Sequence, residues 1–154
     1  MLLLPALAAL IAGCGSQPAG QGSAPTDRAP AEFRASANKI CREFQAKADA
    51  LGSPQTLPQA VDWIDAIRPL TDAEITGLRA LSPPTADATA YRRMLDSYEP
   101  TMRLGEQLRA AALAGNRHRF TVLAGVSVQR QRSYDALARS IGLTDCVGLR
   151  QQST

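Results

Sequence analysis

The sequence predicts an all-α protein, an antiparallel up-down-up-down four-helix bundle, from three observations. From Glu32 onward, apolar residues recur every three or four positions and never alternate over a sustained stretch. The same region is rich in Ala, Leu, Arg, Gln and Glu, which favour helices. Short connections containing Gly or Pro separate the periodic segments, and short connections place consecutive helices antiparallel.

The first helix is expected over residues 32–51. Gly52 follows it directly, and glycine is typical of the position after a helix C-terminus. The apolar residues of this segment form one stripe at helical spacing, which is expected to face the core. The stripe consists of Phe33, Ala37, Ile40, Cys41, Phe44, Ala48 and Leu51.

The second helix is expected to begin near Thr56 and to be broken at Pro69. Thr56 and Gln59 have the spacing of a capping box. A proline inside a helix lacks the backbone donor and clashes with the preceding turn, so Pro69 should interrupt the helix. A second capping-box pattern, formed by Thr71 and Glu74, follows the proline, so the helix is expected to restart at Asp72 and to end at Leu81.

The third and fourth helices are expected over residues 86–114 and 117–141. Pro100 lies within the third helix and is expected to kink it. Gly115 and Asn116 separate the two helices, because glycine favours a helix end and asparagine caps the helix that follows. The two helices should therefore form a tight antiparallel hairpin.

Residues 1–13 are expected to be a signal peptide and not part of the fold. They carry no charge, and as a helix they would measure about 20 Å, too short for the ~30 Å hydrocarbon core of a membrane. The stretch from Ile11 to Cys14 resembles the lipobox of bacterial lipoproteins, in which the cysteine becomes the diacylglyceryl-modified first residue. The resemblance implies that Cys14 is lipidated and anchors the protein to the membrane. The alternative is a buried helix that begins the fold.

The rest of the chain divides into a tether, one domain and a tail. Residues 14–30 are expected to be the lipidated cysteine and a disordered tether, because no large apolar residue follows Cys14 in this stretch. Residues 31–146 have the length of one domain and are expected to form the bundle. Residues 147–154 are expected to be a flexible tail.

Outside the cytoplasm, Cys41 and Cys146 are expected to form a disulfide bond. Counted from the opposite end of the bundle, Cys41 lies about 15 Å along the first helix and Ile141 about 36 Å along the fourth. Residues 142–146 are therefore expected to fold back along the first helix. Metal binding is the weaker alternative, because the single histidine, His118, lies in another segment.

The chain combines a lipobox cysteine, a short tether, an early helical cysteine, Leu-Ser-Pro-Pro before a long helix, Ala-Gly-Asn between long helices and a closing Gly-Leu-x-x-Cys. This layout resembles a class of small exported lipoproteins common in high-GC Gram-positive bacteria. The resemblance covers residues 31–146. It implies the fold and a location outside the cytoplasm, but it implies no chemistry, because the class has no assigned activity.

The sequence predicts no catalytic residues, no metal site and no cofactor. His118 lies near a helix start between Arg117 and Arg119, with no nucleophile nearby, so an exposed histidine is the simpler interpretation. The net charge of +3 is too small to indicate a nucleic-acid surface. The arginines of the fourth helix could attract anionic lipid headgroups, although a solvated basic face is the simpler interpretation.

One group of residues predicts a ligand pocket in the middle of the bundle. The expected breaks at Pro69 and Pro100 fall at nearly the same level, and such breaks widen a bundle locally. Arg130 lies at that level on the fourth helix, where it would give the pocket a cationic lining beside aromatic rings. The alternative is that Arg130 pairs with Glu99 or extends into solvent. The residues assigned to the pocket are Tyr98, Glu99, Ser127, Arg130 and Tyr134.

These observations predict a non-enzymatic, membrane-anchored envelope lipoprotein whose bundle binds a partner protein or a small anionic or amphiphilic ligand. The alternative is an accessory subunit that docks its helices onto another envelope component, and an enzyme with an unrecognised site has least support. A cavity would favour ligand binding, whereas an exposed apolar patch would favour docking. Trp63 helps to discriminate, because an exposed tryptophan at that position would favour docking.

Overall fold

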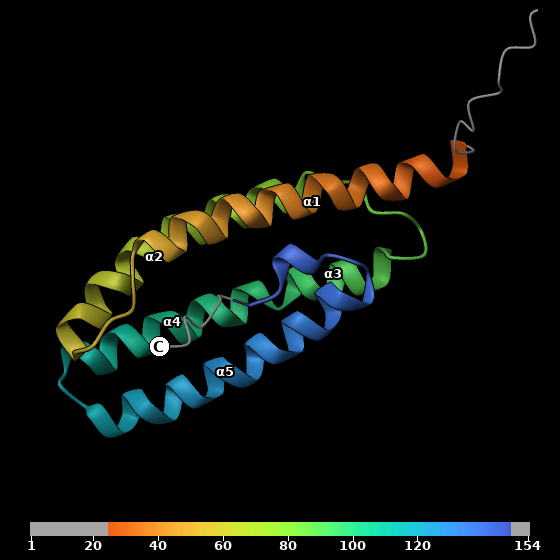
Figure 1. The fold of residues 1–154 in the computed structure, drawn as a ribbon. Coiled ribbons are helices and arrows are strands. Elements are labelled where there is room, and N and C mark those ends of the chain that lie inside the picture. Colours follow the sequence, from red (N-terminus) through yellow and green to blue (C-terminus); the bar gives the residue numbers. More distant parts are fainter. Residues whose placement is uncertain (1–24, 149–154) are drawn as a thin grey trace, which may run out of the picture.

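The chain is helical throughout the part described by the computed structural model, residues 25–148 (Figure 1). The prediction of an all-α fold is confirmed. The predicted signal peptide, Cys14 and residues 149–154 of the predicted tail lie outside the described residues. The elements are α1 (Pro25–Ala50), α2 (Leu57–Arg79), α3 (Ala88–Asp96), α4 (Tyr98–Leu113), α5 (Arg117–Ser140) and the 3-10 helix η1 (Thr144–Cys146).

The helices form a bundle in which consecutive long segments run in opposite directions (Figure 1). The α1–α2 hairpin packs through α2 against α4, and α4 packs against α5. The third segment consists of α3 and α4 end to end. Thr56 and Gln59 form the predicted capping box at the start of α2, and Asn116 accepts a hydrogen bond from the backbone of Arg119 at the start of α5.

The predicted break at Pro69 is wrong, because α2 continues through this residue to Arg79 and does not restart at Asp72. Pro69 lies on the exposed side of α2. The carbonyl of Asp65, which loses its backbone donor to the proline, can therefore be hydrated at little cost. A helix tolerates a proline more easily when the lost hydrogen bond faces solvent.

The third segment is interrupted at Ser97 and not kinked at Pro100 as predicted. Pro100 is the third residue of α4, in the first turn, where backbone N–H groups have no partner within the helix. Its missing donor therefore costs no helical hydrogen bond.

The first helix also differs from the prediction, since α1 begins at Pro25, within the predicted tether. The fixed φ of a proline favours the first helical position.

The largest cluster of buried residues lies where α1, α2, α3 and α5 meet the C-terminal end of the chain. Leu78 and Met94 are fully buried there. The ring of Tyr91 packs edge-on against Phe33, with 5.0 Å between centroids, and its hydroxyl donates a 2.6 Å hydrogen bond to the Leu78 carbonyl. Burial raises the pKa of Tyr91 to about 12. This end of the bundle is therefore tightly packed.

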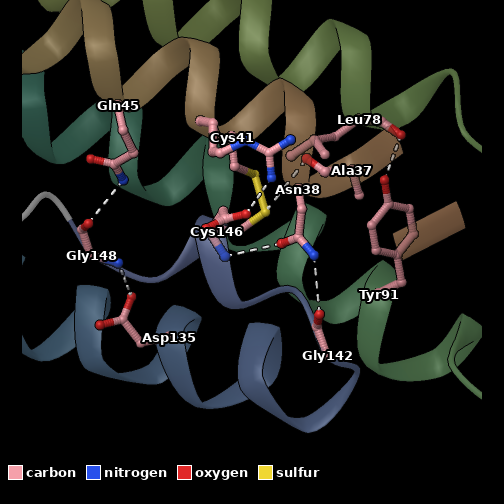
Figure 2. The surroundings of a disulfide bond; sticks show 12 residues. Ala37, Asn38, Cys41, Gln45, Leu78, Tyr91, Asp135, Gly142, Cys146 and Gly148 are labelled. Carbon is pink, nitrogen blue, oxygen red and sulfur yellow. Dashed lines mark hydrogen bonds and ion pairs between the residues drawn. A yellow bond between two sulfur atoms is a disulfide. The ribbon is translucent and has the colours of Figure 1, made fainter. Parts of the chain in front are cut away.

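Residues 142–148, the C-terminal strap, fold back along α1 (Figure 2). The sequence predicted this course for residues 142–146, and Val147 and Gly148, which were assigned to the tail, continue it. The predicted disulfide bond joins Cys41 to Cys146, whose Cα atoms are 4.9 Å apart. Asn38 lies about one helical turn before Cys41 and holds the strap at two points. Its Nδ2 donates to the Gly142 carbonyl at 3.3 Å, and its Oδ1 accepts from the Asp145 backbone at 3.0 Å.

The strap also connects α1 to α5 (Figure 2). Gln45 on α1 donates a 2.8 Å hydrogen bond to the Gly148 carbonyl. The N–H of the same glycine donates to Asp135 on α5 at 2.9 Å, and Asp135 is buried. A satisfied buried carboxylate of this kind fixes the position of its partners. The strap therefore closes one end of the space between the first and last helices.

We expect the disulfide bond to contribute a large part of the stability. Replacing both bridge cysteines, Cys41→Ala with Cys146→Ala, removes a crosslink between residues 105 apart in sequence. In the chain-entropy account, a loop of this length is worth about 5 kcal/mol. Urea unfolding should show a loss of this order, while Cys14→Ala, which keeps the bridge, should match the wild type. A loss below about 1 kcal/mol would contradict the expectation.

Candidate functional site

A cavity of about 230 Å³ lies on the side of the bundle where α1 faces α5. α1 packs against α2 and the strap, and α5 packs against α3 and α4, but α1 and α5 are not among the helix pairs that pack extensively. The space between them is therefore open beyond the strap. The α2 wall extends from Trp63 to Ile75, which is about 18 Å at the helical rise.

The cavity lining is mostly apolar. Side chains from α1, α2, α4 and α5 form its walls, and the surface that they expose to the cavity is mainly apolar although several polar and charged residues contribute to it. This composition is typical of sites that bind small molecules. The large apolar residues of the lining are Phe44, Trp63, Ile64, Ile67, Ile75, Met102 and Leu108.

Tyr98, Ser127, Arg130 and Tyr134, which the sequence assigned to a pocket, all line this cavity. Glu99 does not. Its exposed carboxylate accepts a 2.6 Å hydrogen bond from Arg103, one turn further along α4, and not from Arg130. The predicted cause of the cavity, a break in α2 at Pro69, is absent. The cavity lies instead where α1 and α5 are separated.

Glu74 is the cavity residue that sequence reasoning missed. It was interpreted as a capping residue after Pro69, whereas α2 is continuous and Glu74 lies within it. In a continuous helix Glu74 lies two turns after Ile67, on the same face, and that spacing is the signal that could have identified it. Burial alone raises the pKa of Glu74 to about 8, and no hydrogen bond or cation of the described residues lowers it.

Two further polar atoms of the cavity lining are buried without a partner among the described residues. They are Nε1 of Trp63, a donor, and Oε1 of Gln45, an acceptor. Buried polar atoms without a partner are uncommon because each costs about 1–3 kcal/mol. The cavity therefore offers hydrogen-bonding capacity that the protein itself does not use. Trp63 is half-buried, so it is neither an exposed docking residue nor an ordinary core residue.

The two tyrosines of the site differ in the state of their hydroxyl groups. The hydroxyl of Tyr98 donates a hydrogen bond to Asp72, and Arg79 lies 5.8 Å from the centre of its ring. Burial, and next the carboxylate of Glu74, raise the pKa of Tyr134. Tyr134 therefore remains a neutral donor at physiological pH, and its hydroxyl makes no hydrogen bond to another described residue.

The charged residues near the cavity are mostly paired with each other. Arg109 donates to both carboxylate oxygens of Asp65, at 2.6 and 2.9 Å, and this hydrogen bonding lowers the pKa of Asp65. Arg68 lies 3.3 Å from Glu106. Arg130 is exposed and forms no ion pair with a described residue. The unpaired charges of the lining are therefore the exposed guanidinium of Arg130 and the half-buried carboxyl group of Glu74.

Other kinds of site find no support in the described part of the chain. Residues 25–148 contain no cluster of His, Cys, Asp and Glu side chains able to hold a metal ion. None of their helices combines the length and hydropathy that a membrane span requires. Comparison of the chain with known protein families, curated proteins and solved structures finds no match. The geometry of the cavity is therefore the main guide to function.

We expect Glu74 to make stability depend on pH. Between its ordinary pKa of 4.5 and about 8, the native state keeps a proton that the unfolded chain has lost. Stability should therefore fall as pH rises through this range and level off above it. Glu74→Gln, which carries no charge, should equal the wild type near pH 5 and exceed it at pH 9 by on the order of 2–4 kcal/mol.

Chemical unfolding between pH 5 and pH 9 measures this difference. Glu99→Gln, at an exposed carboxylate on α4, is the matched control and should keep the wild-type pH dependence. An unchanged pH dependence in Glu74→Gln would show that the carboxyl group is hydrated in the native state.

Proposed function

We propose that this protein is a non-enzymatic binding protein, anchored by lipid at the outer face of the cell membrane, whose cavity holds a small amphiphilic molecule. The observation that supports ligand binding is the apolar cavity between α1 and α5, whose lining contains polar atoms without partners. An apolar wall suits the body of an amphiphile, and a few polar atoms suit its head. Docking as an accessory subunit has less support, because Trp63 contributes to the cavity.

The proposed anchor rests on the resemblance of residues 11–14 to a lipobox. Two or more acyl chains on Cys14 would hold the domain at the membrane, whereas a single chain would bind only marginally. The proposed position outside the cytoplasm is compatible with the disulfide bond, since oxidising compartments preserve such bonds.

We expect Cys14→Ala to abolish lipidation. Cells grown with an alkyne-labelled fatty acid should incorporate the label into the wild-type chain and not into Cys14→Ala. Cys41→Ala is the control, because it removes another cysteine and leaves the lipobox intact. Absence of label from the wild type, or label retained by Cys14→Ala, would exclude the anchor.

We expect the full chain with Cys14→Ser, which cannot be lipidated at that position, to bind an uncharged apolar fluorophore such as N-phenyl-1-naphthylamine. Gly105 lines the cavity on α4, and a Cβ atom at this position would meet no atom within 4 Å. Gly105→Leu should therefore fill the cavity and weaken binding of the fluorophore at least tenfold. The same change favours the helix by about 0.8 kcal/mol, so the fold should persist.

Gly125→Leu is the matched control for this test. Gly125 also lies in a helix with open space around it, but it does not line the cavity. This variant should bind the fluorophore with wild-type affinity. If the wild-type chain does not enhance the fluorescence, or if both leucine variants weaken binding equally, the cavity is not a binding site.

A further inference from the structure

The ends of the cavity differ in chemistry. Near the strap the lining includes Glu74, Gln45 and Cys146. Toward the α4–α5 connection it includes the apolar Ile64 and Leu108, together with charged side chains that are already paired, Asp65 with Arg109 and Arg68 with Glu106. The carboxyl group without a partner thus lies at the strap end, and apolar side chains of α2 and α4 extend away from it. A ligand with a polar head and an apolar chain fits this division if its head lies at Glu74.

Glu74 has an unusual position among the acidic residues of the described chain. Asp65, Asp72, Asp87, Asp135 and Asp145 each accept a hydrogen bond from a side chain or backbone group. Glu74 accepts none from the described residues, and it is half-buried in the cavity wall. A carboxylate that is partly removed from water is disfavoured without a cation or donors, and a partner supplied by a ligand would reduce that cost.

The surroundings of Glu74 also favour a positive ligand group over a negative one. The rings of Tyr98 and Tyr134 line the same cavity near Glu74, and aromatic faces attract cations. A carboxylate or phosphate head at this end would meet the like charge of Glu74, which a protonated amino group would not. The basic residues of the rim act against this preference only weakly, because Arg68 and Arg109 are already paired and solvent screens the exposed Arg130.

We propose that the ligand is a single-chain amphiphile with a protonated amino head, in which the head pairs with Glu74 near the strap and the chain lies along the apolar wall of α2 and α4. This inference rests on the proposed binding function and names the ligand class. The chain would pass Ile67, Ile64 and Leu108, over part of the roughly 18 Å between Trp63 and Ile75. The amino group would supply both the charge and the donors that Glu74 lacks.

The test compares three ligands of equal chain length, decylamine, decanol and decanoate, as competitors of N-phenyl-1-naphthylamine at pH 8 and below their micellar concentrations. The protein is the full chain with Cys14→Ser. Decylamine should displace the fluorophore at a concentration at least tenfold lower than decanol, and decanoate should be the weakest competitor. The readout is the ratio of the displacing concentrations of decanol and decylamine. Because both concentrations are measured in the same variant, the ratio can be compared between variants that bind the fluorophore with different affinities.

Glu74→Gln should reduce this ratio to within about twofold of one, because the amide cannot neutralise the amino group. Gly125→Leu should keep the wild-type ratio. The order of the three competitors in the wild type is an independent measurement, which remains informative if Glu74→Gln fails to fold.

Two results would overturn the assignment of the ligand class while leaving the proposed function intact. One is displacement by all three competitors at similar concentrations, which would show that the head group is not recognised. The other is a preference for decanoate that Arg130→Gln removes, which would assign an anionic ligand to the outer part of the cavity. Failure of the wild-type chain to bind the fluorophore would instead contradict the proposed function itself.

Discussion

The attachment of the C-terminal strap to α1 determines the shape of the bundle. The disulfide bond between Cys41 and Cys146 fixes the strap to the middle of α1, and Gly148 then bonds to Gln45 on one side and Asp135 on the other. The first and last helices are joined mainly through this segment and pack little against each other directly. A four-helix bundle normally closes by direct packing of all neighbours, so the strap takes the place of one interface.

The strap gives the two ends of the bundle different packing. Beside it, Cys41, Leu78 and Leu143 are fully buried in one cluster. Beyond it, the part of α5 before Asp135 contributes no buried residue, and Val122 and Val126 are exposed. Apolar surface that is not buried against another helix remains available to a ligand. The tight end therefore provides stability, and the loose end provides the cavity.

The features that could be predicted from the sequence are those that depend on local residue patterns. Helical periodicity, the capping box at Thr56 and the Asn116 cap predicted the helices, and the placement of Cys41 and Cys146 predicted the returning strap. The prolines were misjudged because the cost of a proline depends on whether the lost hydrogen bond faces solvent, which is a tertiary property. That error also concealed Glu74, since a residue interpreted as a cap is not expected to face the core.

Three residues that conflict with local rules line the cavity. Gly105 weakens α4 by about 0.8 kcal/mol relative to alanine, although the structure has room for a side chain there. Glu74 places an acid in an apolar wall, and Trp63 leaves a buried donor unused. Each choice costs stability, and a sequence selected for packing alone would replace all of them. All three line one cavity, whose strap end is closed by a covalent bond. This pattern is expected where ligand binding, and not stability, constrains the choice of residues.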